Sequence, residues 1–149
     1  KTFSNKFGYI GATPLIFEAS IYENIIYGNE ENISREEITS FLKLLDTFKE
    51  EENYDLDREI NNKSLSSGQM QKIAFIRALI SDIDILLLDE ATSNLDDKSK
   101  NIIFTILKEK RVTIVNSTHD PESFENVDAN LQINILDERR EIEIVSTKA

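Results

Sequence analysis

Two adjacent carboxylates, Asp89 and Glu90, directly follow the apolar run Ile85–Leu88. Such a run is typical of a buried strand, and α/β folds place their ligands at the carboxyl ends of parallel strands. One carboxylate there can hold Mg²⁺, directly or through water, and the other can orient or deprotonate a water molecule. Taken alone, most such strings are only a strand end followed by a solvated acidic loop.

A second polar group, Ser66-Ser67-Gly68-Gln69, has the composition of a helix start. Free N–H groups and the positive end of the helix dipole suit an anion at such a place. Gly68 permits close backbone approach, and the hydroxyls of Ser66 and Ser67 add hydrogen-bond donors. The same pattern is also a common capping box, which does no more than begin a helix.

The third candidate is His119, the only histidine, shortly after the apolar run Val112–Asn116. An imidazole at the end of a strand can hydrogen-bond a phosphate and respond to its departure. A lone histidine is more often structural or merely exposed, so its position favours a functional role without establishing one.

The elements that position these residues follow from periodicity and capping signals. Residues 8–17 predict a short strand that ends in a turn at Thr13-Pro14, and the acidic residues 50–64 predict a loop. The other predicted elements are a helix capped by Ser34 and Glu37, a helix from Ser66 to about Ile80, a strand over Ile83–Leu88, a helix carrying Ile102, Ile103, Ile106 and Leu107, a strand over Val112–Asn116, a helix starting at Asp120-Pro121, and a hairpin of Leu131–Ile135 and Glu141–Val145 turning near Glu138–Arg140.

Alternation of strand, helix and strand after residue 65 predicts a parallel α/β sheet, preceded by a helical lobe. The 149 residues suffice for one modest core or for part of a larger domain. The net charge of -11 argues against a nucleic-acid-binding surface but leaves nucleotide binding open, because backbone amides can hold phosphates. The absence of cysteine excludes disulfides and thiolate metal sites. Apolar runs are too short to cross a bilayer, so we expect a cytosolic domain or a piece of one.

In combination these groups resemble the motifs of the ATP-binding cassette (ABC) ATPases. Each string is weak alone, but all of them occur in the expected order and at the expected spacing. The matches are Leu65–Gln69 to the LSGGQ signature with Ser67 at its third position, Ile85–Asp89 to Walker B, Glu90 to the catalytic glutamate, Ser93–Asp96 to the D-loop, and His119 to the switch histidine.

The resemblance implies an α/β fold with a RecA-like P-loop NTPase core and an inserted α-helical subdomain. Residues 1–17 are expected to form a core strand and the Q-loop segment, and residues 18–64 the helical subdomain. Residues 65–149 are expected to form the C-terminal part of the core, a mainly parallel sheet with flanking helices. The sequence Asp89-Glu90-Ala91-Thr92-Ser93 resembles that of the exporter branch of the family more than that of the importer branch.

By the same resemblance, two such domains close head to tail on two Mg-ATP molecules and drive transport through a transmembrane domain at the cytoplasmic face of a membrane. Asp89 is expected to hold Mg²⁺, directly or through water, Glu90 to polarise the attacking water, and His119 to steady the γ-phosphate. The residues expected to face the nucleotide of the opposite domain are Leu65, Ser66, Ser67, Gly68, Gln69 and Asp96.

The chain departs from the family pattern in three places. No G-x-x-x-x-G-K-[ST] phosphate-binding loop occurs, and none of the four glycines precedes Lys-Ser or Lys-Thr. Ala12 stands where the Q-loop glutamine is expected, and Asn61-Asn62-Lys63 replaces the usual Gly-Glu run before the signature. We therefore expect a truncated domain that requires its missing N-terminal half, leaves apolar faces and strand edges uncovered, and neither binds ATP tightly nor hydrolyses it alone.

Two alternatives remain open from the sequence. One is a soluble ABC ATPase of DNA repair or translation, although the acidic net charge and the exporter-like sequence of residues 89–93 argue against it. The other is a non-catalytic interaction module, with Ala12 and the absent phosphate loop as signs of decay.

Overall fold

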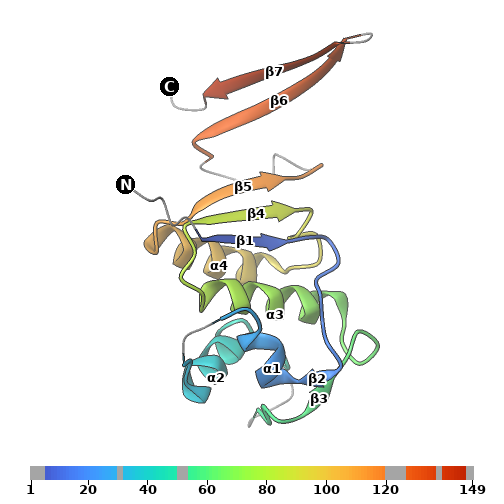
Figure 1. The fold of residues 1–149 in the computed structure, drawn as a ribbon, viewed down its shortest axis with the longest axis vertical. Helices are drawn as coiled ribbons and strands as arrows, with labels where there is room; N and C mark the ends of the chain where they lie inside the picture. The colour runs from blue at the N-terminus through green and yellow to red at the C-terminus, as the bar shows by residue number, and fades with distance from the viewer. Residues whose placement is uncertain (1–5, 30–31, 50–53, 120–126, 137–138, 147–149) are drawn as a thin grey trace. The chain divides into compact units, whose positions relative to one another are not determined.

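The computed structural model describes residues 6–29, 32–49, 54–119, 127–136 and 139–146. The chain forms two compact units that divide between Ser117 and Thr118. The first unit contains a three-stranded sheet with its helices, and the second contains a two-stranded hairpin (Figure 1).

The sheet of the first unit is parallel and has the order β1-β4-β5. It consists of β1 (Phe7–Ile10), β4 (Ile85–Asp89) and β5 (Thr113–Ser117), so the strand that precedes the two carboxylates is the central one. Helices α3 (Ser67–Leu79) and α4 (Asp97–Glu109) lie side by side on one face of the sheet (Figure 1). The predicted α/β class with a parallel sheet and flanking helices is thereby confirmed.

The core lies between the sheet and these two helices. Leu86 and Leu88 of β4 point into it and are buried, whereas Leu87 between them is exposed on the opposite face. Phe75, at the centre of α3, is fully buried. The same hydrophobic cluster continues on the other side of α3, so α3 contributes to the packing of both its neighbours.

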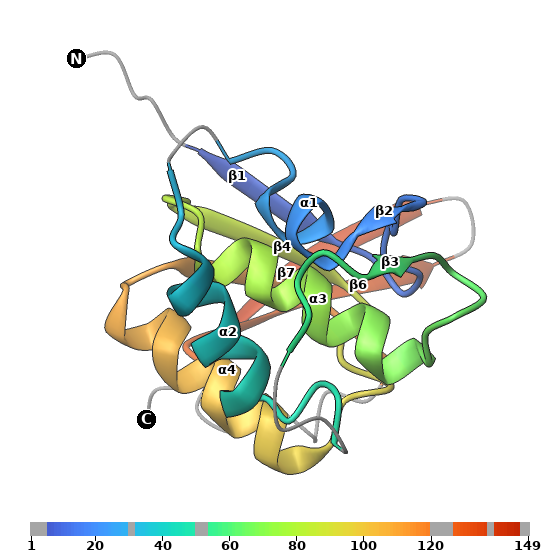
Figure 2. The same cartoon turned by 90° about the horizontal axis from the view of Figure 1, so that it is seen from below.

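A helical lobe packs against the side of α3 that faces away from the sheet (Figures 1 and 2). It comprises α1 (Ile21–Ile26), α2 (Arg35–Leu44) and an antiparallel pair of two-residue strands, β2 (Ala19–Ser20) and β3 (Glu59–Ile60). Within the described residues, no helix combines the length and hydrophobicity needed to cross a bilayer.

Helix starts follow the predicted capping chemistry in part. The predicted capping box at Ser66 and Gln69 is complete, and α3 ends beside Ile80 as expected. Ser34 caps α2 by accepting from the Glu37 backbone N–H at 3.1 Å. A further complete capping box, at Ser20 and Glu23, begins α1 and was not predicted.

Two predicted elements were wrong in extent. The strand predicted from Gly8 to a turn at Thr13-Pro14 already ends at Ile10, and the segment that follows bonds to side chains instead of to a neighbouring strand. The buried Asn24 accepts from the Phe17 N–H at 2.8 Å, and Arg77 donates to the carbonyl of Leu15 at 3.3 Å. The loop predicted over 50–64 contains β3, which residues 19–20 complete by pairing from far away in the chain.

The second unit contains the predicted hairpin. Its strands, β6 (Ala129–Leu136) and β7 (Arg139–Ser146), are antiparallel and longer than expected. Arg140, expected in the turn, lies in β7, where it pairs with Ile135. Glu138 and the predicted helix start at Asp120-Pro121 lie outside the described residues.

Candidate functional site

The two carboxylates lie where the central strand ends, in different backbone conformations. Asp89 is the last residue of β4, exposed on the same face as Leu87 and paired with Ser117 of β5. Glu90 follows with a positive φ of 52°, in the left-handed region that non-glycine residues seldom occupy. Its N–H donates to the Ser117 carbonyl at 3.0 Å, and its carbonyl accepts from Ser93 Oγ at 3.2 Å. These bonds hold a backbone turn that aims the Asp89 and Glu90 side chains differently.

Strained backbone of this kind recurs at active sites, where surrounding contacts maintain a conformation that is locally unfavourable. The sequence showed which residue type stands at position 90 but gave no sign of this conformation. Asp46 and Arg111 also have a positive φ, so the turn is compatible with the functional role of Glu90, which stays a prediction.

The magnesium ion implied by the family fits the donor chemistry at this end of the sheet. Mg²⁺ keeps several waters and binds one or two carboxylates together with substrate phosphates. Asp89 offers one exposed carboxylate, which is a ligand of the kind that Mg²⁺ prefers. Asp89 thus suits an ion whose remaining ligands are water and phosphate.

The signature residues form the first turn of α3. Ser66 Oγ accepts from the Gln69 N–H at 3.1 Å, and Gln69 Oε1 accepts from the Ser66 N–H at 2.8 Å. Leu65 packs partly against the core, while Ser67 is exposed. A Cβ atom added to Gly68 would lie 2.9 Å from the carbonyl oxygen of Asn94. The glycine is therefore required for the close approach of the signature to the loop that precedes α4.

Signature and D-loop residues meet in one cleft of about 480 Å³. Ser66, Gly68 and Gln69 contribute one side of it, and Asn94 and Asp96 contribute another. The turn after α2 also lines it, through residues 46–49 and the buried Thr47. Two motifs that are separate in the sequence thus share one open, polar surface at a helix N-terminus.

Asp96 is the N-cap of α4 and is also ion-paired. Its Oδ1 accepts from the Ser99 N–H at 2.8 Å, and its Oδ2 lies 3.0 Å from Lys72 Nζ. Partial burial raises the pKa of Asp96, but the hydrogen bonds from Ser99 and Lys72 outweigh this, and the pKa lies well below its ordinary value. Asp96 is therefore a charged carboxylate throughout the neutral range.

This depressed pKa predicts that Asp96 contributes to acid sensitivity of the fold. Its stabilising contribution is complete above the unfolded pKa of about 3.9 and is lost as the pH falls from there through the folded pKa. Asp96→Asn retains a capping oxygen but does not titrate. We expect the urea midpoint of Asp96→Asn to fall less than that of the wild type between about pH 6 and about pH 3.

The neighbouring Asp97→Asn is the matched control, because the Asp97 side chain is 97% exposed and lies 3.9 Å from Lys100. It should keep the wild-type dependence on pH. Equal loss of the urea midpoint on acidification in Asp96→Asn and in the wild type would contradict the role given to Asp96.

Two further predicted residues, Ala12 and His119, are exposed. Ala12 is exposed in the irregular segment after β1 and does not line the cleft. His119 is exposed in the second unit, just beyond the end of β5. Its contact with the γ-phosphate stays a prediction.

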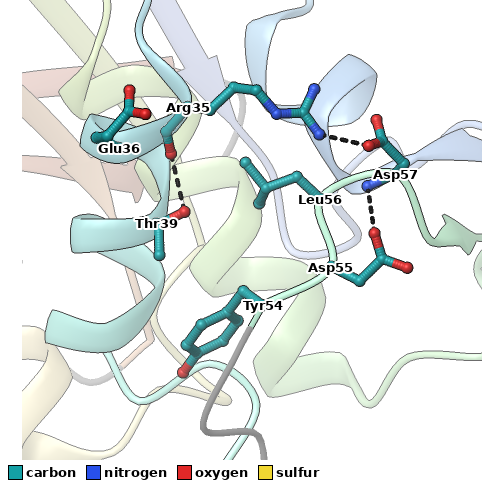
Figure 3. A pocket seen from close by; sticks show the side chains of 7 residues that line it. All are labelled: Arg35, Glu36, Thr39, Tyr54, Asp55, Leu56 and Asp57. Atoms are coloured by element: carbon teal, nitrogen blue, oxygen red, sulfur yellow. Dashed lines mark hydrogen bonds and ion pairs between the residues drawn. The ribbon is translucent and has the colours of Figure 1, made fainter.

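A second hollow, of about 450 Å³, lies on the helical lobe between the first turn of α2 and residues 54–57 (Figure 3). Arg35 reaches toward Asp57, with 2.7 Å between Nη2 and Oδ2, and also lies over the ring of Tyr22. None of the residues predicted for nucleotide chemistry lines this hollow. It is therefore separate from the candidate site.

Two residues that hold the cleft together, Gln71 and Lys72, were not predicted from the sequence. Both are buried, and Gln71 Oε1 accepts from the Asn94 N–H at 3.0 Å. Helical spacing could have identified them, because residues one helical turn after Gly68 face the same side of α3 as Gly68 itself. Polar residues on that side require partners, and the D-loop supplies them.

Comparison with known proteins identifies the family of this chain. The ABC transporter family profile matches residues 1–93. The ATP-dependent permease MDL1 of Candida albicans is 36% identical over 89% of this chain and 20% of its own length. The lactococcin-A transport/processing ATP-binding protein LcnC of Lactococcus lactis is 39% identical over 74% of this chain and 16% of its own length.

A solved structure of a bacterial Atm1-family ABC exporter with ATP bound superposes with a TM-score of 0.71 at 26% identity. The match covers 84% of this chain and 23% of that chain. The chain therefore spans about a fifth of the length of these relatives. With the family profile matched over more than half of its residues, the chain belongs to the ABC transporter family.

Proposed function

We propose that this chain is the C-terminal part of the nucleotide-binding domain of an ABC exporter, which couples ATP hydrolysis to transport across a membrane. The observation that carries the proposal is the shared cleft of the signature and the D-loop. Its helix N-terminus, polar lining and open form suit a polyphosphate presented by another domain. The relatives, whose names describe permeases and transport proteins, support the exporter assignment.

In this proposal each site residue has one task. Asp89 holds Mg²⁺, which neutralises phosphate charge when it is bound. Glu90 orients and polarises the water that attacks the γ-phosphate in line, and His119 hydrogen-bonds that phosphate. Ser66, Ser67, Gly68 and Gln69, with Leu65 packed behind them, face the γ-phosphate held by the opposite domain, and Asp96 links the two sites.

The first proposed partner is an N-terminal half that carries the phosphate-binding loop. Its docking surface is the sheet face opposite α3 and α4, where large apolar side chains of all three strands are exposed. Tyr9, Leu87 and Val115 form one row across this face, since Tyr9 pairs with Leu87 and Leu87 with Val115. An apolar face of this kind favours a covering layer, and Asp89 lies on the same face.

The other proposed partners are a transmembrane domain and a second nucleotide-binding domain, with the chain at the cytoplasmic face of the membrane. A soluble ABC ATPase of DNA repair or translation is the alternative. Transmembrane segments encoded in the same protein or in an adjacent gene favour the exporter, and a nucleic-acid-binding region in their place favours the alternative.

Calorimetry with Mg-ATP tests whether the ATP site is shared between this chain and the N-terminal half. The isolated chain should bind no ATP at micromolar concentrations, because the loop that cradles the phosphates is absent from its sequence. The same chain joined to the N-terminal half should bind and hydrolyse ATP. Micromolar affinity in the isolated chain, or no hydrolysis by the joined domain, would count against the proposal.

A further inference from the structure

One buried lysine joins three helices beside the candidate cleft. Lys72 on α3 is only 6% exposed, which is unusual for a lysine without a partner. Its Nζ lies 3.0 Å from Asp96 Oδ2 at the start of α4. The same ammonium donates to the carbonyl of Asp46, 3.4 Å away, just beyond the end of α2.

Both partners of Lys72 are negatively polarised groups, a carbonyl just beyond the C-terminal end of α2 and the carboxylate of Asp96. Helix α2 ends in a turn in which Asp46 has a φ of 49° and the Thr47 N–H donates to the Leu42 carbonyl at 3.0 Å. The unpaired carbonyls at such a helix end attract a cation. Asp96 adds a full negative charge from the opposite side, so the ammonium lies between two acceptors that belong to different helices.

Lys72 acts in the same region as the signature. The segment Asn94–Asp96 contacts α3 at three positions: Asn94 O lies against Gly68, the Asn94 N–H bonds to Gln71, and Asp96 pairs with Lys72. The first two contacts fix the backbone of this segment. The Asp96 carboxylate accepts from the Ser99 N–H and hydroxyl within its own helix, and the ion pair with Lys72 is the contact that ties it to α3, with little solvent competition at the lysine.

We propose that Lys72 is a positioning residue, which holds Asp96 and the D-loop in register with Ser66 and Gly68 so that signature and D-loop meet the opposite nucleotide as one rigid surface. This inference rests on the proposed function. Without the ammonium, the Asp96 carboxylate keeps its bonds to Ser99 but loses its tie to α3, so the D-loop keeps its backbone contacts while its acid is no longer held in register with the signature.

The test measures ATP hydrolysis by the complete domain with four variants: Lys72→Met, Lys72→Arg, Asp96→Asn and the double variant Lys72→Met/Asp96→Asn. Lys72→Met should lower kcat on the order of 10- to 100-fold, the cost of a misplaced group, with KM for ATP nearly unchanged. Lys72→Arg should recover most of the activity because it retains the charge. Adding Lys72→Met to Asp96→Asn should change kcat by less than about twofold, since Lys72 acts through Asp96.

Lys100→Met is the control, because Lys100 makes only a 3.9 Å pair with the exposed Asp97 on the same helix. It should leave kcat at the wild-type value. Unchanged kcat in Lys72→Met, or losses that multiply in the double variant, would overturn the inference. If Lys72→Met does not fold, the comparison of Asp96→Asn with the double variant still decides, because the double variant leaves neither charge unpaired.

Failure of this inference is distinguishable from failure of the proposed function. An active Glu90→Gln variant removes the proposed catalytic assignment whatever Lys72 does. An inactive Glu90→Gln variant together with a fully active Lys72→Met variant removes only the positioning role.

Discussion

Replacing Glu90 with glutamine in the complete domain should lower the rate of ATP hydrolysis by about 10²- to 10⁴-fold, the usual contribution of a positioned general base. Glutamine keeps the size of the side chain and retains an oxygen, but it cannot accept a proton from the attacking water. The left-handed backbone at position 90 and its bond to the Ser117 carbonyl remain available to glutamine. We therefore expect loss of kcat with ATP binding retained, measured by phosphate release and by equilibrium binding.

The matched control is Glu109→Gln, which makes the same chemical change at an exposed position at the end of α4. It should hydrolyse ATP at the wild-type rate. Undiminished hydrolysis by Glu90→Gln would show that another group activates the water, and the role assigned to Glu90 would have to be abandoned.

The second large effect is expected on stability. Phe75→Ala should destabilise the fold by about 3–5 kcal/mol, the usual cost of deleting a buried aromatic ring. Phe75 is 0% exposed at the centre of α3, which packs against both the sheet and the helical lobe. That cost is a large fraction of the about 5–15 kcal/mol that stabilises a typical domain. Urea unfolding followed by circular dichroism should show a much lower midpoint or no folded baseline.

Phe7→Ala provides the same deletion at a ring that is 64% exposed. In the isolated chain its midpoint should stay close to wild type, because surface substitutions usually change stability by less than about 0.5 kcal/mol. Equal midpoints for the two variants would mean that α3 is not the centre of the core. Joining the chain to its proposed N-terminal half should make Phe7→Ala destabilising as well, since that half is proposed to cover this face.

Local signals account for the elements that the sequence predicted well. The capping box at Ser66 and Gln69 and the apolar periodicity after it operate within a few residues, and α3 begins and ends as predicted. Asp96 likewise begins α4, the helix predicted from the isoleucines that follow it. The parallel sheet followed from the alternation of strands and helices, which is a property of chain order.

Errors arose where distant partners decide the structure. The strand predicted from Gly8 to a turn at Thr13-Pro14 stops earlier, at Ile10, and Asn24 and Arg77 from elsewhere in the chain bond to the segment that follows. Strand β3 was not predicted, because a strand of two residues is too short to show a periodic pattern. Only its pairing with Ala19 and Ser20 defines it.

By itself, the sequence determined the family of this protein and supplied the candidates for its reacting groups, because side-chain chemistry and motif order are properties of the chain itself. Asp89, Glu90 and the signature could be named without coordinates. Only the tertiary structure decided the left-handed turn at Glu90, the burial of Lys72 and its ion pair with Asp96. These features depend on how α2, α3, α4 and the sheet pack together, and no short window of sequence contains that information.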